Sequence, residues 1–394
     1  MNKLSPLSNT NDADVPSAQM EGMDIHSNVV TPDITRPSSP VQASLPPSPL
    51  PSKRHKVAIV GSGSFGTALA KIVAKNVASR PKEFHSEVRM WVREKIVHGK
   101  QLTKVINSTH MNDRYLPDVK LPSNLVAVGN LKQVVKDATM LVMVTPHQFL
   151  STVLEEFQTE GVITPGAISI SAIKGVEVNG ADISTFATLI EEKIGTPCAA
   201  LGGPNVAQDV ANEQFCETTV GAKTADECAL WSAVFHTNRF KVSTVQDVSG
   251  VSLAGALKNV VALAAGFVDG LKLGSNTKAS IMRMGLQEMA EFTVEFFPGS
   301  KKETFSEPAG MADLITSCYS GRNKKCAEIF AKTGESWEKI EKNHLNGQLL
   351  QGTLTTKEVH NFLVSRKRTY AYPLFEAVYA ISFEGRPVKT IIDI

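Results

Sequence analysis

Short runs of consecutive apolar residues recur between residues 56 and 245, and segments with helical spacing of apolar positions lie between them. Runs of this length, bounded by turn residues, are typical of strands buried on both faces, as in a parallel sheet. The expected strands are residues 56–60, 87–92, 140–144, 167–171, 198–201, 218–221 and 240–245, with helices at 67–73 and around 183–194. This alternation predicts an α/β fold with a doubly wound sheet of about eight strands.

The strand pattern almost disappears after Val245, and the rest of the chain has the periodicity of consecutive helices. One amphipathic helix is expected from Asn276, with apolar residues at Ile281, Met284, Met289, Phe292 and Phe296. The most apolar stretch, 252–271, is rich in Gly and Ala and contains Lys258 and Asp269, which favours a packed helix over a membrane span. We therefore expect an α/β domain at 56–245 and an all-helical domain at 246–394.

Residues 1–55 differ in composition, with nine of the 20 prolines, one glycine and no aromatic residue. Such a segment cannot bury enough apolar surface to offset its ordering entropy, so we expect a disordered tail. It is either an inert solvated tail or a regulatory one, since Thr31, Ser39 and Ser48 each precede proline. It has five acidic residues and no apolar signal region, so we expect neither a secretory signal nor a transit peptide, and a cytoplasmic protein by default.

The charge balance is close to neutral, with 41 basic and 39 acidic residues and a formal net charge of +2. This balance gives no general attraction to nucleic acid or to an anionic membrane. The five cysteines form no C-x-x-C pair, and neither they nor the histidines have ligand spacing, so we expect a reducing compartment and no metal.

A glycine motif follows the first predicted strand and leads into a helix, in the order strand, turn, helix. This context makes a G-x-G-x-x-G match specific for a dinucleotide, although a purely structural turn is the alternative. Gly61 forms the tight turn, Gly63 lets backbone N–H groups approach a pyrophosphate, and Gly66 lets helix and strand pack closely. Residues 56–245 are therefore predicted to be a Rossmann-type nucleotide-binding domain.

Residues after the next strands bear on the choice of cofactor. An NAD-specific fold usually has an acidic residue after the second strand, to bind the ribose 2′-hydroxyl, whereas this chain has Arg93 followed by Glu94. Arg93 is expected either to stack on adenine, to bind a 2′-phosphate or to be solvated. The sequence therefore does not decide whether the cofactor is NAD or NADP. Phe149 is expected either beside the nicotinamide or as the first core residue of the next helix. His147 is either an acid or base, or a residue that shapes the loop.

Two lysines have the placement of catalytic groups. Lys258 lies in the nearly all-apolar segment 253–266. An ammonium there must form an ion pair, reach water by extending along the apolar surface (snorkelling), or face a cleft in which it has a function. Burial and nearby cations lower the pKa of such a lysine, as proton transfer to a carbonyl oxygen requires. Lys174 follows the strand 167–171, at the carboxyl edge of the sheet where ligands bind in such folds.

Two further polar groups are candidates for substrate binding. Asn205, in a compact turn at 202–207, either caps the following helix or orients a substrate. Arg322 and Asn323 follow Gly321 in a turn that presents a planar guanidinium and an amide, which suits a phosphate, although a solvated basic turn is the alternative.

Taken together, the motifs resemble those of the eukaryotic NAD-dependent glycerol-3-phosphate dehydrogenases, from about Lys56 to the C-terminus. They occur in order as Gly-Ser-Gly-x-x-Gly, Pro-His-Gln-Phe, Ile-Lys-Gly, Asn-x-Ala, Gly-Ala-Leu-Lys-Asn, Ala-Asp-Leu-Ile-Thr, Gly-Arg-Asn and Leu-Gln-Gly. The resemblance implies reversible hydride transfer from NADH to dihydroxyacetone phosphate, which gives sn-glycerol 3-phosphate. It also implies a homodimer and a role in glycerolipid precursor supply and NADH reoxidation.

Site residues follow from the same motifs, as what the resemblance implies. The catalytic set is Lys258, Lys174, Asp313, Asn205 and Ser317. The cofactor set is Gly61, Ser62, Gly63, Ser64, Phe65, Gly66, Arg93, Phe149, Lys174, Ala207, Arg322 and Gln351. The substrate set is Lys174, Lys258, Asn259, Arg322 and Asn323.

Four positions depart from the family pattern. Ser64 and Phe65 replace an Asn-Trp pair, and Pro204 replaces an alanine. Leu349 stands where animal members have a lysine near the cofactor, and Arg93 stands where many members have an aromatic residue. The glycines are kept, so we expect the loop to bind its ligand, with NAD as cofactor and NADP use left open.

Two other functions fit parts of the pattern. A 3-hydroxyacid or phosphogluconate-type dehydrogenase has the same architecture but needs a carboxylate-binding site beside Lys258, and the Arg322–Asn323 pair favours phosphate instead. A non-catalytic NADH-sensing protein, with the tail as its interaction arm, is the second alternative.

Overall fold

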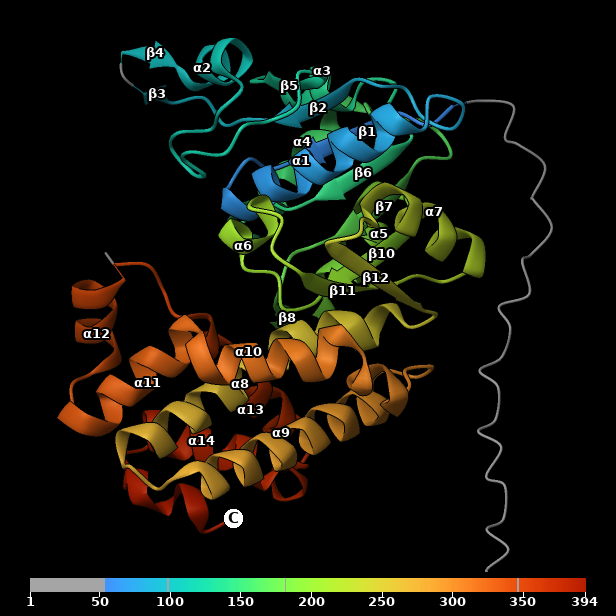
Figure 1. The fold of residues 1–394 in the computed structure, drawn as a ribbon. Coiled ribbons are helices and arrows are strands. Elements are labelled where there is room, and N and C mark those ends of the chain that lie inside the picture. The colour runs from blue at the N-terminus through green and yellow to red at the C-terminus, as the bar shows by residue number, and fades with distance from the viewer. Residues whose placement is uncertain (1–53, 98, 181, 346) are drawn as a thin grey trace, which may run out of the picture. The chain divides into compact units, whose positions relative to one another are not determined.

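The structure is a computed structural model that describes residues 54–97, 99–180, 182–345 and 347–394 of the chain (Figure 1). The predicted disordered tail, residues 1–55, lies almost entirely outside the described residues.

An eight-stranded sheet forms the first half, in the order β12-β11-β10-β7-β6-β1-β2-β5. All neighbouring pairs are parallel except β10 and β11, which are antiparallel. The strands are β1 (Val57–Val60), β2 (Val88–Trp91), β5 (Leu125–Val128), β6 (Met140–Met143), β7 (Ile168–Ser171), β10 (Cys198–Gly202), β11 (Cys216–Gly221) and β12 (Phe240–Val245). The predicted doubly wound fold is confirmed.

The strand β1 shows why helices must cover both faces of the sheet. Its four residues are all buried, and successive side chains point to opposite faces. Val57 and Ile59 join one apolar cluster, whereas Ala58 and Val60 join another. The first cluster includes α1 (Ser64–Ser79), α2 (Leu102–Thr109), α6 (Ala207–Ala211) and α7 (Ala225–Phe235). The second includes α3 (Leu131–Val135), α4 (Leu150–Glu160) and α5 (Phe186–Ile194).

Three features of this half differ from the sequence prediction. The strand β5 was not predicted, and neither were two small hairpins, β3 (Ile96–Val97) with β4 (Lys100–Gln101) and β8 (Val176–Asn179) with β9 (Asp182–Thr185). The helix expected around 183–194 begins only at Phe186. Its start is fixed by Thr185, whose hydroxyl accepts from the Thr188 backbone N–H at 3.2 Å and so ends β9.

The second half is built around α8 (Val248–Gly270), which is buried continuously from Leu253 to Val268. Around it lie α9 (Ser275–Phe296), η2 (Lys302–Ser306), the π-turn η3 (Pro308–Ala312), α10 (Asp313–Ser320), α11 (Arg322–Thr333), α12 (Trp337–His344), α13 (Gln351–Ser365), η4 (Thr369–Ala371), α14 (Pro373–Phe383) and η5 (Val388–Ile392). Within the part of the chain that the structure describes, α8 alone is long and apolar enough to cross a bilayer, but its surface is covered by protein.

The helix α8 joins the two halves. Two residues separate it from the end of β12, and Asp247 caps it by accepting from the Gly250 N–H at 2.7 Å. Val251 on its first turn packs with Ala200 of β10 and Ala309 of η3. The hairpin β8–β9 packs against the helical core through Val176. Side chains of α8 are thereby held at a fixed position beside the carboxyl edge of the sheet.

The glycine turn provides a test of this packing. A Cβ on Gly66 would lie 2.4 Å from the Gly61 carbonyl oxygen, whereas a Cβ on Gly63 would meet nothing within 4 Å. Because overpacking against backbone costs about 1–3 kcal/mol, we expect Gly66→Ala to lower the free energy of unfolding by that amount. Gly63→Ala, at φ −63°, should leave it unchanged in the absence of ligand. Denaturant unfolding of both variants measures the difference, and equal stabilities would contradict the geometry.

Candidate active site

The glycine turn lies at the point where the sheet order reverses, because β1 has β2 on one side and β6 on the other. Gly61 has φ +130°, and a Cβ there would lie 2.8 Å from the Val144 carbonyl oxygen. Only glycine fits this turn without strain. The first turn of α1 begins at Ser64, so its free N–H groups are available to an anion.

Two buried side chains outside the predicted site, Thr67 and Asn112, hydrogen-bond to the backbone of the turn. Thr67 donates from its hydroxyl to the Ser62 carbonyl at 3.1 Å. Asn112 donates to the same carbonyl at 3.0 Å and to the Thr67 hydroxyl at 2.8 Å. These bonds fix the peptide at Ser62 and leave the opposite side of the loop open. Asn112 lies outside any motif, so nothing in the sequence indicated it.

A cavity of about 510 Å³ opens beside the turn. It is lined by Gly61, Ser62, Gly63, Trp91, Arg93, Tyr115, Thr145, Pro146, Phe149, Thr152, Val153 and Glu156. Of the predicted cofactor set, Gly61, Ser62, Gly63, Arg93 and Phe149 line it, whereas Ser64, Phe65, Gly66, Lys174, Ala207, Arg322 and Gln351 do not. Ser64 donates to the Tyr115 carbonyl at 2.5 Å, and Phe65 packs against the core of the sheet, so only their backbone N–H groups remain for a phosphate.

Arg93 and Phe149 meet inside this cavity, with the guanidinium carbon 5.0 Å from the centre of the ring. Phe149 was expected beside the nicotinamide or in the helix core. Its side chain is 39% exposed, which argues against a core position, and it lies against Arg93, which follows β2 at the adenosine end of such a site. The place beside the nicotinamide stays a prediction. Phe149 is the last residue of the short helix η1 (His147–Phe149), which follows β6. His147 stacks on Phe186, and burial lowers the pKa of its ring.

Glu94 is turned away from the cavity. Its carboxylate accepts from the Thr103 hydroxyl at 2.6 Å and from the backbone N–H groups of Thr103 and Lys95. Although burial opposes it, this hydrogen bonding lowers the pKa of Glu94. The side chain therefore holds the start of α2, and Arg93 is the charged residue that follows β2 and lines the cavity.

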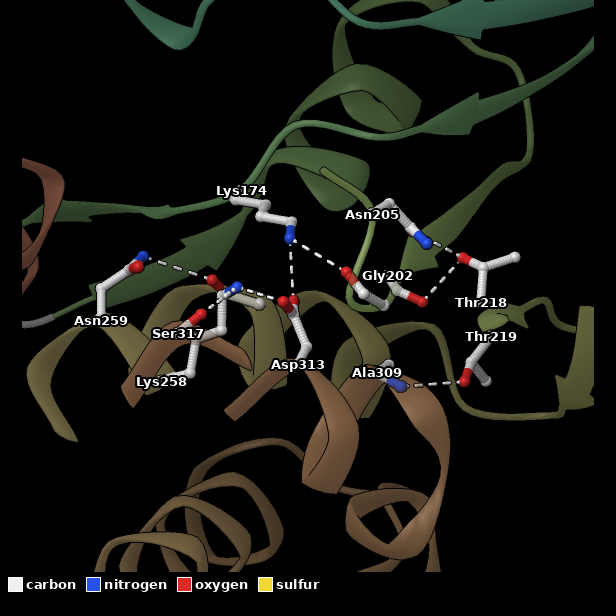
Figure 2. A network of polar contacts seen from close by, with 12 residues as sticks. Lys174, Gly202, Asn205, Thr218, Thr219, Lys258, Asn259, Ala309, Asp313 and Ser317 are labelled. Carbon is white, nitrogen blue, oxygen red and sulfur yellow. Dashed lines mark hydrogen bonds and ion pairs between the residues drawn. The ribbon is translucent and has the colours of Figure 1, made fainter. Parts of the chain in front are cut away.

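A second group of predicted residues meets around one carboxylate (Figure 2). Asp313, the first residue of α10, pairs through Oδ1 with the ammonium of Lys258 on α8. Its Oδ2 lies 2.8 Å from the Lys174 ammonium, which follows β7 and also donates to the Gly203 carbonyl at 3.3 Å. Ser317, one turn further along α10, accepts from Lys258 at 2.8 Å.

Backbone geometry allows this approach. Gly175 has φ +134°, and a Cβ there would lie 2.8 Å from the Phe186 ring, so the turn after Lys174 needs glycine. Gly255 of α8 lies against the Lys174 stem, where a Cβ would be 3.5 Å from its Cγ. That distance is an ordinary van der Waals contact, so of these two glycines only Gly175 is required for the approach of Lys174 to Asp313.

The two lysines differ in their surroundings. The Lys258 side chain is 7% exposed, whereas the Lys174 side chain is 31% exposed. Burial lowers the pKa of Lys258 to about 7; Asp313 opposes this shift and the neighbouring Lys174 ammonium adds to it. Lys258 can therefore gain or lose a proton near neutral pH, as a general acid or base must.

Asn205 is held near the same edge of the sheet and does not cap α6, whose N-cap residue is Val206. Its amide nitrogen donates to the Glu217 carbonyl at 2.9 Å, and its oxygen lies 3.1 Å from the Thr218 hydroxyl. The predicted cofactor residue Ala207 is the first residue of α6 and packs against the sheet core. Thr218 lies outside the motifs, so no sequence signal indicated it.

The remaining predicted residues meet on the helical side. Asn323 on α11 donates to the side chain of Asn259, the neighbour of Lys258, at 2.8 Å, and accepts from the Gly352 N–H at 2.9 Å. Gln351 begins α13 beside this contact. Arg322 is not hydrogen-bonded to the lysine pair; it is exposed and donates to Gln348 at 3.2 Å.

The two groups of residues lie at one edge of the sheet, because β7 and β1 are separated by β6 alone and neighbouring strands lie about 5 Å apart. A nucleotide held at the glycine turn would thus react close to an ammonium that can exchange its proton near pH 7. This combination places the chain among the nicotinamide-dependent dehydrogenases. No group of three His, Cys, Asp or Glu side chains that could hold a metal ion occurs in the described ranges.

Comparison with known proteins defines the class further. Residues 56–228 match NAD-dependent glycerol-3-phosphate dehydrogenase N-terminus, and residues 247–393 match NAD-dependent glycerol-3-phosphate dehydrogenase C-terminus. The chain belongs to the family of NAD-dependent glycerol-3-phosphate dehydrogenases. This membership agrees with the resemblance seen in the motifs and excludes the hydroxyacid dehydrogenase alternative.

Similar proteins occur in fungi and animals. The chain is 47% identical over 350 residues to glycerol-3-phosphate dehydrogenase (NAD(+)) 1 of Schizosaccharomyces pombe, covering 87% of this chain and 90% of that protein. It is 46% identical over 338 residues to the cytoplasmic glycerol-3-phosphate dehydrogenase (NAD(+)) of Rattus norvegicus, covering 86% and 96%. The structure of glycerol-3-phosphate dehydrogenase from Saccharomyces cerevisiae superposes with a TM-score of 0.83 at 42% identity, covering 86% and 99%.

Arg93 and Glu94 give a prediction about cofactor choice. A 2′-phosphate beside Arg93 would gain a charge-assisted hydrogen bond of about 1.5–3 kcal/mol. We expect Arg93→Phe to weaken NADPH binding at least about tenfold more than NADH binding. Fluorescence titration of both nucleotides measures this ratio. Glu94→Gln is the matched control and should leave the ratio unchanged, because Glu94 faces α2. If Arg93→Phe lowered the affinities for NADH and NADPH by the same factor, a contact of Arg93 with the 2′-phosphate would be contradicted.

Proposed function

We propose that this chain reduces dihydroxyacetone phosphate to sn-glycerol 3-phosphate and catalyses the reverse reaction, using the residues described above. The observation that carries the proposal is the buried carboxylate of Asp313 between two ammonium groups, at the same sheet edge as the glycine turn. Bound NADH supplies the hydride, and the chain supplies the charge and the proton that the substrate oxygen needs.

Lys258 acts as the general acid in this proposal. Negative charge grows on the carbonyl oxygen as hydride reaches the carbon, and a positioned proton donor lowers that barrier. Asp313 and Ser317 each contact the Lys258 ammonium and so fix its direction. Lys174 and the Asn205 amide lie on the sheet side and stabilise the same oxygen.

Arg322, Asn323 and Asn259 form the phosphate side of the site. Asn323 is already oriented by Asn259 and by the Gly352 N–H. Arg322 begins α11, whose first N–H groups are free for an anion. Binding the phosphate far from the reacting carbon orients the substrate, which makes the chemical step more probable. The contact between Arg322 and Gln348 is exposed to solvent, so in this proposal it breaks when Arg322 binds the phosphate.

The organisation of the whole protein follows from the same assignment. Residues 56–245 serve as the NAD-binding domain and residues 246–394 as the substrate domain, since the glycine turn is in the first and Lys258 and Asp313 are in the second. We further propose that the protein is a homodimer. We also propose that it works in the cytoplasm, because one relative is named cytoplasmic. Its role is glycerolipid precursor supply and NADH reoxidation.

The substrate assignment predicts a strict need for the phosphate. Purified protein should oxidise NADH with dihydroxyacetone phosphate and should turn over unphosphorylated dihydroxyacetone far more slowly. Arg322→Gln should raise the KM for the phosphorylated substrate about 10- to 100-fold, since it removes charge-assisted hydrogen bonds. Arg283→Gln, an exposed position on α9 whose guanidinium bonds Gln287, is the control and should change nothing. Equal rates with the two substrates would refute the assignment.

The role of Lys258 predicts a pH dependence. Reduction needs the ammonium form, so its kcat should fall as the pH rises through about 7, and oxidation should show the opposite trend. Asp313→Asn removes the charge that raises the pKa of Lys258, so both inflections should move to lower pH. The reduction rate at pH 7 should drop about 10²- to 10⁴-fold. An unchanged inflection in Asp313→Asn would show that another group controls the profile.

A further inference from the structure

Two adjacent threonines on β11 connect the sheet to both sides of the site. Successive residues of a strand point to opposite faces, and both threonines are fully buried. The Thr218 hydroxyl oxygen lies within hydrogen-bond distance of two acceptors, 2.8 Å from the Gly202 carbonyl oxygen and 3.1 Å from the Asn205 amide oxygen. Thr219 accepts from the backbone N–H of Ala309 at 3.0 Å, in the turn that leads to Asp313 (Figure 2).

The Ala309 contact anchors the π-turn η3. This turn begins with Pro308, which has no N–H, so the Ala309 N–H is the first donor of the turn. The first N–H groups of a helix have no partner within the helix and need one elsewhere. Thr219 provides that partner from the sheet, and Ala309 packs there against Ala200 and Val251.

The turn has little freedom to move on its other side. A Cβ on Gly310 would lie 2.3 Å from the Phe305 carbonyl oxygen, so the backbone of η3 lies directly against the preceding segment. Ser243 on β12 donates to the Thr219 hydroxyl at 3.2 Å and holds it in place. The hydroxyl thus fixes a turn whose next residue is Asp313, and single-turn π-segments occur often at functional sites.

We propose that Thr219 is a positioning residue, whose hydroxyl holds the turn 308–312 on the sheet and thereby keeps the Asp313 carboxylate between Lys174 and Lys258. Asp313 needs this support because its two partners come from different halves of the chain, one from the β7 loop and one from α8. The proposal rests on the proposed function for its kinetic consequence, since the carboxylate matters there through the acidity of Lys258.

The kinetic test compares three variants. Thr219→Val removes the hydroxyl at nearly constant shape, and we expect a loss of about tenfold in kcat for reduction, with the pH inflection moved lower as in Asp313→Asn. Thr219→Ser keeps the hydroxyl and should restore both the rate and the inflection. Thr218→Val is the matched neighbour: it loosens Asn205, so the rate should fall while the inflection stays at its wild-type value. NADH affinity should be unchanged in all three, because neither threonine lines the cavity.

Amide hydrogen exchange of the full chain tests the same anchor without any activity. Thr219→Val should raise the exchange rate of residues 309–313 by about tenfold or more, and Thr219→Ser should not. Thr219→Ala serves as a second variant if Thr219→Val folds poorly. The proposal would be overturned if residues 309–313 exchanged at the wild-type rate in both Thr219→Val and Thr219→Ala. It would also be overturned if they exchanged faster than in the wild type in Thr219→Ser. A wild-type protein with no turnover of dihydroxyacetone phosphate would instead refute the proposed function, and the exchange result would still decide the anchor.

Discussion

One buried carboxylate, that of Asp313, determines the arrangement of the site. A charge taken out of water is stable only when it is paired and hydrogen-bonded, and Asp313 is paired with a lysine from each half of the chain. Two ammonium groups share one carboxylate, so the cluster retains excess positive charge. This excess, together with burial, lowers the pKa of Lys258 and makes an ordinary lysine a proton donor near neutral pH. The stability and the proposed chemistry therefore depend on the same contact.

The two halves of the fold divide the work around this contact. The sheet supplies a glycine turn at its switch point and a cavity that is lined on one side by Arg93 and Phe149. The helical half supplies α8, an apolar helix that places Lys258 where almost no water reaches it. Because α8 starts directly after β12 and packs on β10, the ammonium is fixed relative to the glycine turn. The more exposed cation of the pair, Lys174, comes from the loop after β7 on the sheet side of the carboxylate.

Local patterns predicted the elements, and tertiary contacts explain what was missed. Strands such as β1 were predictable because they are apolar throughout, and the glycine spacing identified the turn because only glycine fits at Gly61. The strand β5 (Leu125–Val128) is an apolar run of the same length, and it was missed; only alternate residues of it are buried, as expected for a strand at the edge of the sheet. The sequence indicated Lys258 by its apolar surroundings, but the contact between Lys174 and Asp313 spans 139 residues and came only from the family resemblance. Thr219 and Asn112 act through hydrogen bonds to residues that are distant in the chain, for which the sequence has no signal.

The most direct test of this account is the titration of the Lys258 side chain itself. NMR of the full-length protein with ¹³C at the lysine Cε position follows each ammonium separately, and the Lys258 signal is assigned by its loss in Lys258→Arg. We expect this signal to titrate near pH 7, well below the ordinary lysine pKa of about 10.4. A Lys258 signal that stays protonated up to pH 10 would contradict the central claim, because burial and the Lys174 charge would then not control its acidity.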